Sequence, residues 1–256
     1  MEYECIIYET SDRIAVIKLN RPKVLNAMNK QLWLDFQAAL EAARCDTDVK
    51  VVVVTGEGRA FSTGADLKES KTRSLEDYRD YLEELQEASR KLMRFEKPTI
   101  AAINGYALGS GYELALACDI RIAASDAQIG SPEAKVTSSV TGGAMRLVQG
   151  LIGPGKACEL LFTAESITGS EAARIGLVNR AVAQDELMDE VRYMAAKIAA
   201  NSSFSIKMIK RGLLMARGGI SLEALMDYEV EACLACVSTK ERQASLDNFA
   251  DRKKDV

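Results

Sequence analysis

The chain contains no histidine among its 256 residues, and this absence excludes several kinds of active site. A Ser-His-Asp triad, a Cys-His pair and every histidine-ligated metal site need an imidazole group, which this chain cannot supply. Acid and base chemistry near neutral pH must therefore come from carboxylates, lysine, tyrosine or cysteine. The carboxylates are the first candidates for catalytic groups.

The chain also lacks long runs of apolar residues and long runs of basic residues. No apolar stretch approaches the roughly 20 residues that span a bilayer, and the N-terminal residues do not resemble a secretory signal. The formal net charge is −4 and no long basic run occurs, which disfavours nucleic-acid binding. These features predict a cytoplasmic protein that has neither a membrane partner nor a nucleic-acid partner.

The six cysteines are scattered along the chain, and their spacing does not resemble a disulfide framework. A reducing compartment is therefore expected. Cys233 and Cys236 are expected to share one face of a helix, and no second pair of ligands accompanies them. Buried packing is predicted for these two thiols, and no metal site is predicted in the chain.

Strand-like and helix-like segments alternate along the chain, which predicts an α/β fold. Strands buried on both faces of a sheet are predicted by β-branched or apolar runs at 49–55, 99–103 and 119–123. A hairpin is expected over 3–9 and 13–19, and residues 56–64 are expected to form a loop. Helices are predicted at 26–43, 74–95, 109–118, 143–150, 154–162, 170–175, 186–200, 202–217, 221–236 and 240–249, with a short strand at 178–182.

Two glycine-rich turns each stand beside a glutamate. Gly109-Ser110-Gly111 opens a helix just before Glu113, and Gly130-Ser131-Pro132 precedes Glu133. The first N–H groups of a helix lack partners inside the helix, and small residues let a ligand approach the backbone. Thr63-Gly64-Ala65 is another turn of this type. If the turns at Gly64 and Gly109 each direct a backbone N–H group at one oxygen of a ligand, they form an oxyanion hole. The sequence leaves that convergence open.

The sequence is also compatible with purely structural roles for several of these residues. Glu113 in a first helical turn also complements the helix dipole, and Glu133 fits a solvated loop. Asp66 is expected to cap a helix that begins at Leu67. Trp33 is expected to lie in the core, because it belongs to the apolar face of a helix.

Five segments together resemble the crotonase superfamily, and in particular its enoyl-CoA hydratases. They are Arg21–Met28, Gly58–Lys68, Gly105–Ala115, Cys118–Arg121 and Ile175–Arg180. The resemblance covers nearly the whole chain, in the family's order and at its spacing. It implies a spiral core of ββα units with the acyl-CoA site over residues 1–195, and a helical trimerisation region over 196–256. Homotrimers, commonly paired into homohexamers, are implied as well.

The resemblance also implies roles for individual residues. Glu113 would hold and deprotonate a water molecule, and Glu133 would protonate the α-carbon, in syn addition of water to a 2-enoyl-CoA thioester. The N–H groups of Ala65 and Ser110 would form the oxyanion hole. Coenzyme A is then part of the substrate, and no separate cofactor is implied. Contacts with the acyl-CoA are implied for Lys23, Leu25, Ala65, Asp66, Leu67, Lys68 and Ser110, and further along the chain for Phe249 and Lys253.

Two departures from the family's pattern stand out. The oxyanion turn usually reads Gly-Gly-Gly, and Ser110 at its centre keeps the N–H group but restricts the backbone angles. After Glu133, a polar and β-branched segment over 134–141 replaces the usual Pro-Gly loop that borders the acyl pocket. This segment argues against a plain straight-chain substrate and favours a cyclic, branched or hydroxylated enoyl-CoA.

Several other functions stay open at this point. Within the family they are a double-bond isomerase, a thioester hydrolase or decarboxylase, and a cyclic-dienoyl-CoA hydratase. Isomerases usually keep only one of the two glutamates, so the presence of both argues against that chemistry. A non-catalytic homologue that binds CoA esters is a further alternative. RNA binding is known for some relatives, but the acidic charge balance opposes it.

Overall fold

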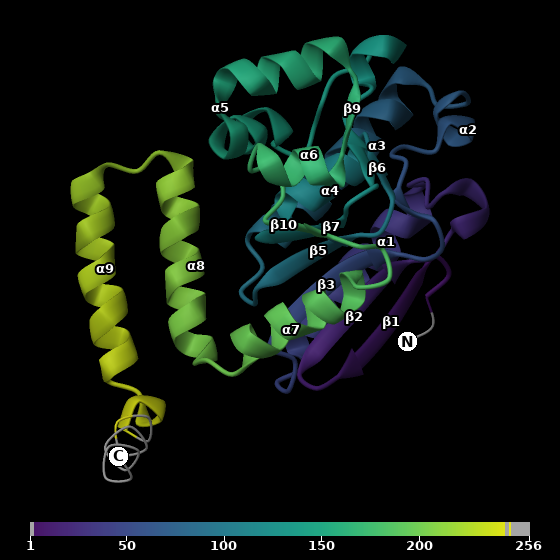
Figure 1. Cartoon of the computed structure of the whole chain (residues 1–256). Coiled ribbons are helices and arrows are strands. Elements are labelled where there is room, and N and C mark those ends of the chain that lie inside the picture. Colours follow the sequence, from purple (N-terminus) through teal and green to yellow (C-terminus); the bar gives the residue numbers. More distant parts are fainter. Residues whose placement is uncertain (1–2, 244–245, 247–256) are drawn as a thin grey trace. The chain divides into compact units, whose positions relative to one another are not determined.

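The computed structural model describes residues 3–243 and 246, which belong to two compact units (Figure 1). The first unit is Met1–Ala199 and contains the described strands. The second unit is Ala200–Val256, and its described part is helical. Phe249 and Lys253, which were expected near the CoA, lie outside the described residues, as does half of the expected helix at 240–249.

The larger sheet of the first unit contains six strands in the order β1-β2-β3-β5-β7-β10. Their bounds are β1 (Ile6–Ser11), β2 (Ile14–Leu19), β3 (Val51–Gly56), β5 (Thr99–Ile103), β7 (Ile120–Ala124) and β10 (Arg180–Val182). Strands β1 and β2 form an antiparallel hairpin, and the other neighbours run parallel. Every residue of β3 and β5 is buried, as their continuous apolar character predicts.

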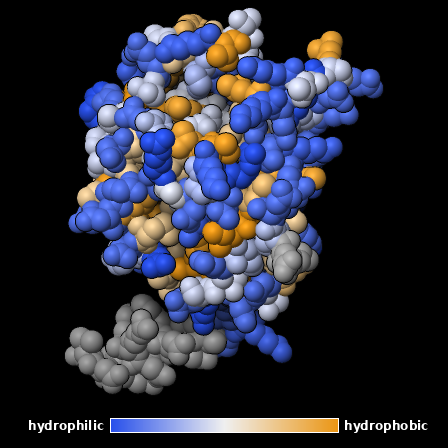
Figure 2. All heavy atoms as spheres, turned by 90° about the vertical axis from the view of Figure 1, so that its right-hand side faces the viewer, coloured by the Kyte–Doolittle hydropathy of each residue, from blue (hydrophilic) through white to orange (hydrophobic). Residues whose placement is uncertain are grey.

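Helices cover both faces of this sheet, so two apolar cores form (Figure 1). On one face lie α1 (Lys30–Cys45) and α3 (Leu75–Met93), and the fully buried Trp33 confirms its predicted place in the core. On the other face, α7 (Leu187–Ala199) packs against the alternate residues of β3 and β5. The surface turned to the viewer in Figure 2 is mainly hydrophilic, with apolar side chains in small separate patches.

Helix α1 begins four residues later than the predicted 26–43. Residues Pro22–Val24 form a short 3₁₀ turn, η1, and both Leu25 and Asn26 have positive φ angles, of 54° and 56°. Asn29 then caps α1, because its side chain accepts the Leu32 N–H. The family-like segment before α1 is therefore a folded turn rather than the first turns of a helix.

A second sheet of four short strands was not predicted. Its order is β4-β6-β8-β9, with the bounds β4 (Ala60–Ser62), β6 (Tyr106–Leu108), β8 (Gln128–Gly130) and β9 (Ser166–Thr168). The prediction of an uninterrupted loop over 56–64 was therefore wrong at β4. A strand of three residues is too short to show a periodic pattern, and the glycines beside these strands have the composition of turns.

The two sheets are connected by a repeated ββα unit, which confirms the expected spiral. Each unit contributes one strand to the larger sheet, the next strand to the smaller sheet, and then a helix. The three units end in α3, α4 (Ser110–Ala117) and α5 (Ala144–Thr163), and α2 (Leu67–Ser70) and α6 (Gly169–Arg174) are shorter helices in the same unit. Strands β4, β6 and β8 are parallel neighbours, so the loops that follow them meet at one edge of the smaller sheet.

The second unit contains the helical hairpin of α8 (Ser203–Gly218) and α9 (Leu222–Val237). The two helices pack on each other, and the Tyr228 hydroxyl donates a hydrogen bond of 2.8 Å to the Met208 carbonyl. Cys233 is exposed and Cys236 is partly buried, so the prediction of buried packing was wrong for Cys233. The apolar neighbours of these thiols in the sequence lie on exposed helix faces, which the sequence pattern could not distinguish from a core.

Substitution of Gly111 tests how tightly α4 packs on the smaller sheet. A Cβ atom at this position would lie 2.5 Å from the Ser62 carbonyl oxygen and 2.7 Å from the Ser62 Cβ. We expect Gly111→Ala to lower the free energy of unfolding by about 1–3 kcal/mol, because the added methyl overpacks this contact. Gly150→Ala, on α5, is the matched control, because a Cβ there meets nothing within 4 Å. Urea denaturation of both variants measures the difference, and equal stabilities would contradict this close contact.

Candidate active site

The loops that follow β4 and β6 meet backbone to backbone, and a side chain from the loop after β8 lies against the second of them. A Cβ atom at Gly64 would lie 2.9 Å from the Leu108 carbonyl oxygen and 3.1 Å from the Ser110 nitrogen. A Cβ at Gly109 would lie 3.0 Å from Glu133 Oε1. The convergence that the sequence left open is therefore present, and it depends on glycine at both turns.

Two backbone N–H groups at this junction are available to a ligand. Met28 pairs with the turn through the bonds Met28 N–H to Gly64 O (2.8 Å) and Asp66 N–H to Met28 O (3.1 Å). Ala65 lies between Gly64 and Asp66, so its N–H group points away from Met28. Ser110 is the first residue of α4. Neither the Ala65 N–H nor the Ser110 N–H donates to any other described residue.

The serine at the centre of the Gly109-Ser110-Gly111 turn does not strain the backbone. Gly109 carries the positive φ angle of 54°, with ψ at −127°, whereas Ser110 is not among the described residues with positive φ. The positive φ angle therefore requires glycine at Gly109, whereas the backbone at Ser110 accepts a side chain. The expected restriction of the backbone angles by Ser110 therefore causes no unfavourable φ angle at this position.

Glu113 lies one helical turn beyond Ser110 and is almost fully buried, with 2% of its surface exposed. Both of its carboxylate oxygens accept hydrogen bonds from Thr141. The backbone N–H of Thr141 donates to Oε1, and its hydroxyl donates to Oε2 at 2.6 Å. Thr141 follows the 3₁₀ turn η2 (Glu133–Val136), so a residue distant in sequence fixes the carboxylate.

Burial raises the pKa of Glu113 to about 7. The two hydrogen bonds from Thr141 act in the opposite direction, because they favour the charged form, and the nearby charge of Glu133 raises the pKa further. A carboxyl group with this pKa is present in both protonation states near neutral pH. It can therefore accept or donate a proton there, as a catalytic acid or base must.

Glu133 is the first residue of η2 and is partly exposed, in contrast to Glu113. The hydroxyl of the buried Ser131 donates a hydrogen bond to its Oε2. Its Oε1 lies beside Gly109, at the turn between the two free N–H groups and Glu113. The structure therefore brings together all four predicted residues: Glu113, Glu133, Ala65 and Ser110.

Hydroxyl groups in the site were missed by the sequence reasoning. Thr141 and Ser131 each hold one of the two glutamates, but the sequence predicted no role for either hydroxyl group. Ser131 stands two residues before Glu133, which was the only available signal. Thr141 is 28 residues from Glu113, and only the fold shows that they meet.

The expected CoA-binding segments lie beside each other. The N–H of Thr63 donates to the Leu25 carbonyl at 3.1 Å, which joins the η1 segment with Lys23 and Leu25 to the loop after β4. Asp66 accepts the Lys68 N–H at 3.0 Å and thus caps α2, as predicted. Its other oxygen pairs with Arg21 at 2.8 Å, a contact that was not predicted. Leu67 and Lys68 are exposed on α2.

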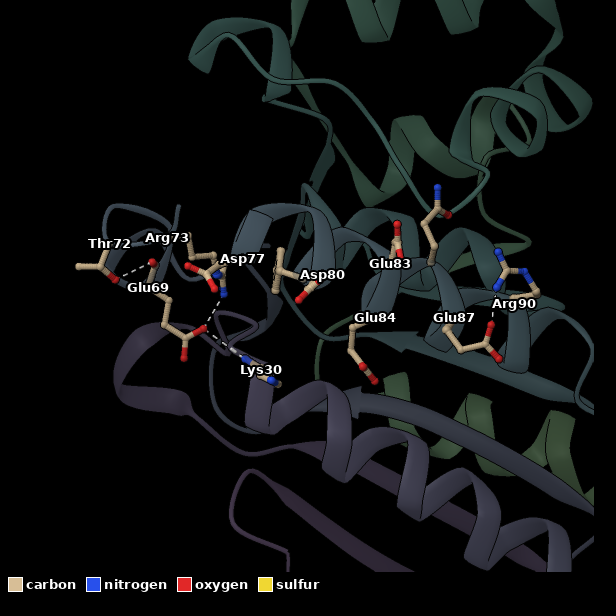
Figure 3. Close-up of a pocket in the computed structure, with 12 residues that line it drawn as sticks. Lys30, Glu69, Thr72, Arg73, Asp77, Asp80, Glu83, Glu84, Glu87 and Arg90 are labelled. Atoms are coloured by element: carbon tan, nitrogen blue, oxygen red, sulfur yellow. Dashed lines mark hydrogen bonds and ion pairs between the residues drawn. The ribbon is translucent and has the colours of Figure 1, made fainter. Parts of the chain in front are cut away.

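A separate polar groove of about 1010 Å³ lies along α2, α3 and the start of α1 (Figure 3). Its acidic side chains outnumber the basic ones, and two of the basic residues already form ion pairs, Arg73 with Glu69 and Arg90 with Glu87. The excess of negative charge would repel the phosphates of a nucleotide. Neither Glu113 nor Glu133 lines this groove.

Two further findings apply to the described part of the chain. Residues 3–243 and 246 contain no group of three or more histidine, cysteine, aspartate or glutamate side chains arranged to hold a metal ion. Within the same residues, no helix combines the length and the apolar character needed to cross a bilayer.

Replacement of Glu113 by glutamine is expected to stabilise the fold at high pH. Because the folded-state pKa of Glu113 is raised, its contribution to stability is complete below about pH 4.5 and is lost as the pH rises towards 7. Glutamine fits both Thr141 contacts without a charge. At pH 8, Glu113→Gln should therefore be more stable than the wild type, by on the order of 1–3 kcal/mol.

Urea unfolding at pH 5 and at pH 8 measures this effect. The difference between Glu113→Gln and wild type should be small at pH 5 and large at pH 8. Glu159→Gln on the exposed side of α5 is the matched control and should show little change at either pH. A difference that is the same at both pH values would refute the burial of a titrating charge at Glu113.

Comparison with known proteins places this chain among relatives of similar length. Residues 9–256 match the family described as enoyl-CoA hydratase/isomerase. A crotonyl-CoA hydratase from Syntrophomonas wolfei is 38% identical over 260 residues, which cover 99% of this chain and 98% of that protein. A short-chain-enoyl-CoA hydratase from Clostridium acetobutylicum is 36% identical, with 99% and 97% covered.

The fold agrees with these relatives. The crystal structure of an enoyl-CoA hydratase from Bacillus anthracis matches with a TM-score of 0.94 and 31% identity, over 97% of each chain. An enoyl-CoA hydratase structure from Geobacillus kaustophilus matches with a TM-score of 0.92 and 32% identity, over 98% of this chain and 97% of the other. The resemblance drawn from the sequence motifs is confirmed, and the chain belongs to the enoyl-CoA hydratase/isomerase family.

Proposed function

We propose that this protein is an enoyl-CoA hydratase, a hydro-lyase that adds water reversibly to a 2-enoyl-CoA thioester. The observation that carries the proposal is the meeting of Glu113 and Glu133 with two unpaired backbone N–H groups at one edge of the smaller sheet. The names of the two relatives described above support the same activity.

The two N–H groups have the arrangement of an oxyanion hole. In this proposal, the thioester carbonyl oxygen of the substrate accepts hydrogen bonds from Ala65 and Ser110. Negative charge develops on that oxygen as the hydroxyl group of water adds to C3. Donors fixed by the fold stabilise this charge without reorganisation, and the loss of one such donor typically costs about 3–4 kcal/mol in the barrier.

The two glutamates divide the proton transfers between them. Glu113 accepts a proton from the attacking water, whose hydroxyl group bonds to C3. Glu133 donates a proton to C2, so the elements of one water molecule are added across the double bond. The pKa of Glu113, about 7, suits a base at neutral pH, because a substantial fraction is ionised. Both carboxylates act from one side of the substrate, which gives syn addition.

Binding of the substrate is assigned to the η1 segment and to the loop that follows β4. Lys23, on the exposed side of η1, is proposed to approach the CoA phosphates, and Leu25 the pantetheine. Residues 65–68 are proposed to contact the adenine, mainly through backbone groups, since the Asp66 carboxylate is already bound by Arg21 and Lys68. Coenzyme A enters as part of the substrate, and no further cofactor has a role in this scheme.

The kind of acyl group that the enzyme accepts can be determined by experiment. The polar segment 134–141 favours a branched, cyclic or hydroxylated acyl group, whereas the relatives are named for crotonyl-CoA and short-chain enoyl-CoA. A panel of thioesters that contains both kinds distinguishes the two expectations.

Self-association into a homotrimer or homohexamer is a second part of the proposal. The α8–α9 hairpin exposes more than half of each of several large apolar side chains, namely Ile209, Leu213, Leu222, Met226, Val230, Leu234 and Val237. Exposed apolar surface of this kind is typical of protein contacts. We also propose a cytoplasmic location, which is supported by the free state of the six cysteines.

The hydratase activity is tested by the loss of enoyl absorbance with crotonyl-CoA and with branched and cyclic 2-enoyl-CoA thioesters. We expect turnover by the wild type, and a decrease in kcat of about 100-fold or more in Glu113→Gln and in Glu133→Gln, because each loses a proton-transfer group. Glu159→Gln should retain full activity. Turnover that survives in both site variants would contradict the assignment, and acyl-CoA binding without any turnover would favour a non-catalytic homologue.

The oligomeric state is tested by sedimentation velocity. Wild-type protein should sediment as a trimer or hexamer. Leu213→Glu or Leu234→Glu should shift the population towards the monomer, because a charge would be buried in the apolar contact. The exposed and charged position Glu223 offers a control, and Glu223→Gln should leave the mass unchanged. A monomeric wild-type protein would contradict this part of the proposal.

A further inference from the structure

Thr141 contacts the proposed catalytic base at both of its oxygens. Its backbone N–H donates to Oε1 of Glu113, and its hydroxyl donates to Oε2 at 2.6 Å. A glutamate side chain has three rotatable bonds, and a single hydrogen bond would leave its carboxylate free to turn. Two bonds from one residue fix both the position and the plane of the carboxylate.

The loop around Thr141 is built for this close approach. The two residues that follow, Gly142 and Gly143, have φ angles of 59° and 77°, which favour glycine. A Cβ atom at Gly142 would lie 3.3 Å from the Glu113 Cβ and 3.1 Å from the Ser89 hydroxyl. The glycines therefore let the backbone of this loop lie against α4, with the Thr141 N–H directed at the carboxylate.

The two hydrogen bonds also oppose the effect of burial. Removal of Glu113 from water favours its neutral form, whereas donors that point at both oxygens favour the carboxylate. Ser131 gives Glu133 only a single donor, from a side chain. The two glutamates are thus held differently, and only the buried one has a donor at each oxygen.

We propose that Thr141 is a positioning residue that keeps Glu113 ionised near neutral pH and orients its carboxylate towards the attacking water. The effect on turnover rests on the proposed hydratase function. The effect on the ionisation of Glu113 does not, because it follows from the two hydrogen bonds alone.

Three other titratable groups lie near Glu113 in the described part of the chain. Among the described residues, the charge of Glu133 on η2 acts on Glu113, and the charge of Glu113 in turn acts on Tyr81 on α3 and Tyr112 on α4. Burial raises the pKa of both tyrosines above the ordinary value, so neither phenol ionises in the range where Glu113 titrates. Of these three groups, Glu133 is therefore the one whose charge acts on Glu113.

The test uses Thr141→Val, which keeps the backbone N–H and the shape of the side chain but removes the hydroxyl. Thr141→Ser retains the hydroxyl, and Thr141→Ala guards against a folding defect caused by the second methyl of valine. Thr163→Val is the matched control, because the Thr163 hydroxyl bonds only to the Glu159 carbonyl and the Glu165 N–H on the exposed side of α5. Thermal unfolding of each variant confirms that it is folded.

The first readout is the ionisation of Glu113 itself, followed by infrared titration of its carboxyl band and assigned by the loss of that band in Glu113→Gln. We expect the midpoint to rise by about one pH unit or more in Thr141→Val and Thr141→Ala, and to stay near the wild-type value in Thr141→Ser and Thr163→Val. An unchanged midpoint in Thr141→Val and Thr141→Ala would overturn the proposal.

The second readout is the pH dependence of kcat/KM with the best 2-enoyl-CoA substrate. The acidic limb should move to higher pH by the same amount in Thr141→Val, so that activity at pH 6 falls about tenfold more than activity at pH 9. Equal loss at every pH would indicate a merely structural role and would overturn the proposal. If the wild type has no hydratase activity, the proposed function fails, but the infrared titration still decides the role of Thr141.

Discussion

The site depends on the direct backbone contact between the turns at Gly64 and Gly109. A side chain at Gly64 would meet the Ser110 nitrogen at 3.1 Å, and one at Gly109 would meet Glu133 Oε1 at 3.0 Å. The parallel order of β4, β6 and β8 brings these turns to one edge of the smaller sheet. Because no side chain separates them, two N–H groups lie close to the two carboxylates of the site.

A second constraint is the balance between burial and hydrogen bonding at Glu113. Burial alone would keep this carboxyl group neutral, and the two donors of Thr141 alone would keep it charged. Together with the charge of Glu133, they bring its pKa to about 7, which is the range that proton transfer at neutral pH requires. The proposed chemistry therefore depends on the contact with Thr141 as much as on the glutamate.

The sequence predicted the larger sheet and most of the helices, because β3 and β5 are continuous apolar runs and the helices are long enough to show their period. The smaller sheet was missed, since its strands contain three residues each. The family motifs predicted roles for Glu113, Glu133, Ala65 and Ser110, and the fold brings these residues together. Thr141 could not be predicted, because its contact with Glu113 joins residues that are 28 positions apart and belong to no shared motif.

Hydration of a 2-enoyl-CoA in D₂O, followed by NMR of the product, tests the central claim most directly. If Glu113 and Glu133 act from one side of a thioester held by Ala65 and Ser110, the 3-hydroxyacyl product carries one deuterium at C2, syn to the new hydroxyl group at C3. Deuterium on both faces of C2, an anti relationship, or exchange at C2 without net hydration would contradict the arrangement of the two glutamates that the structure indicates.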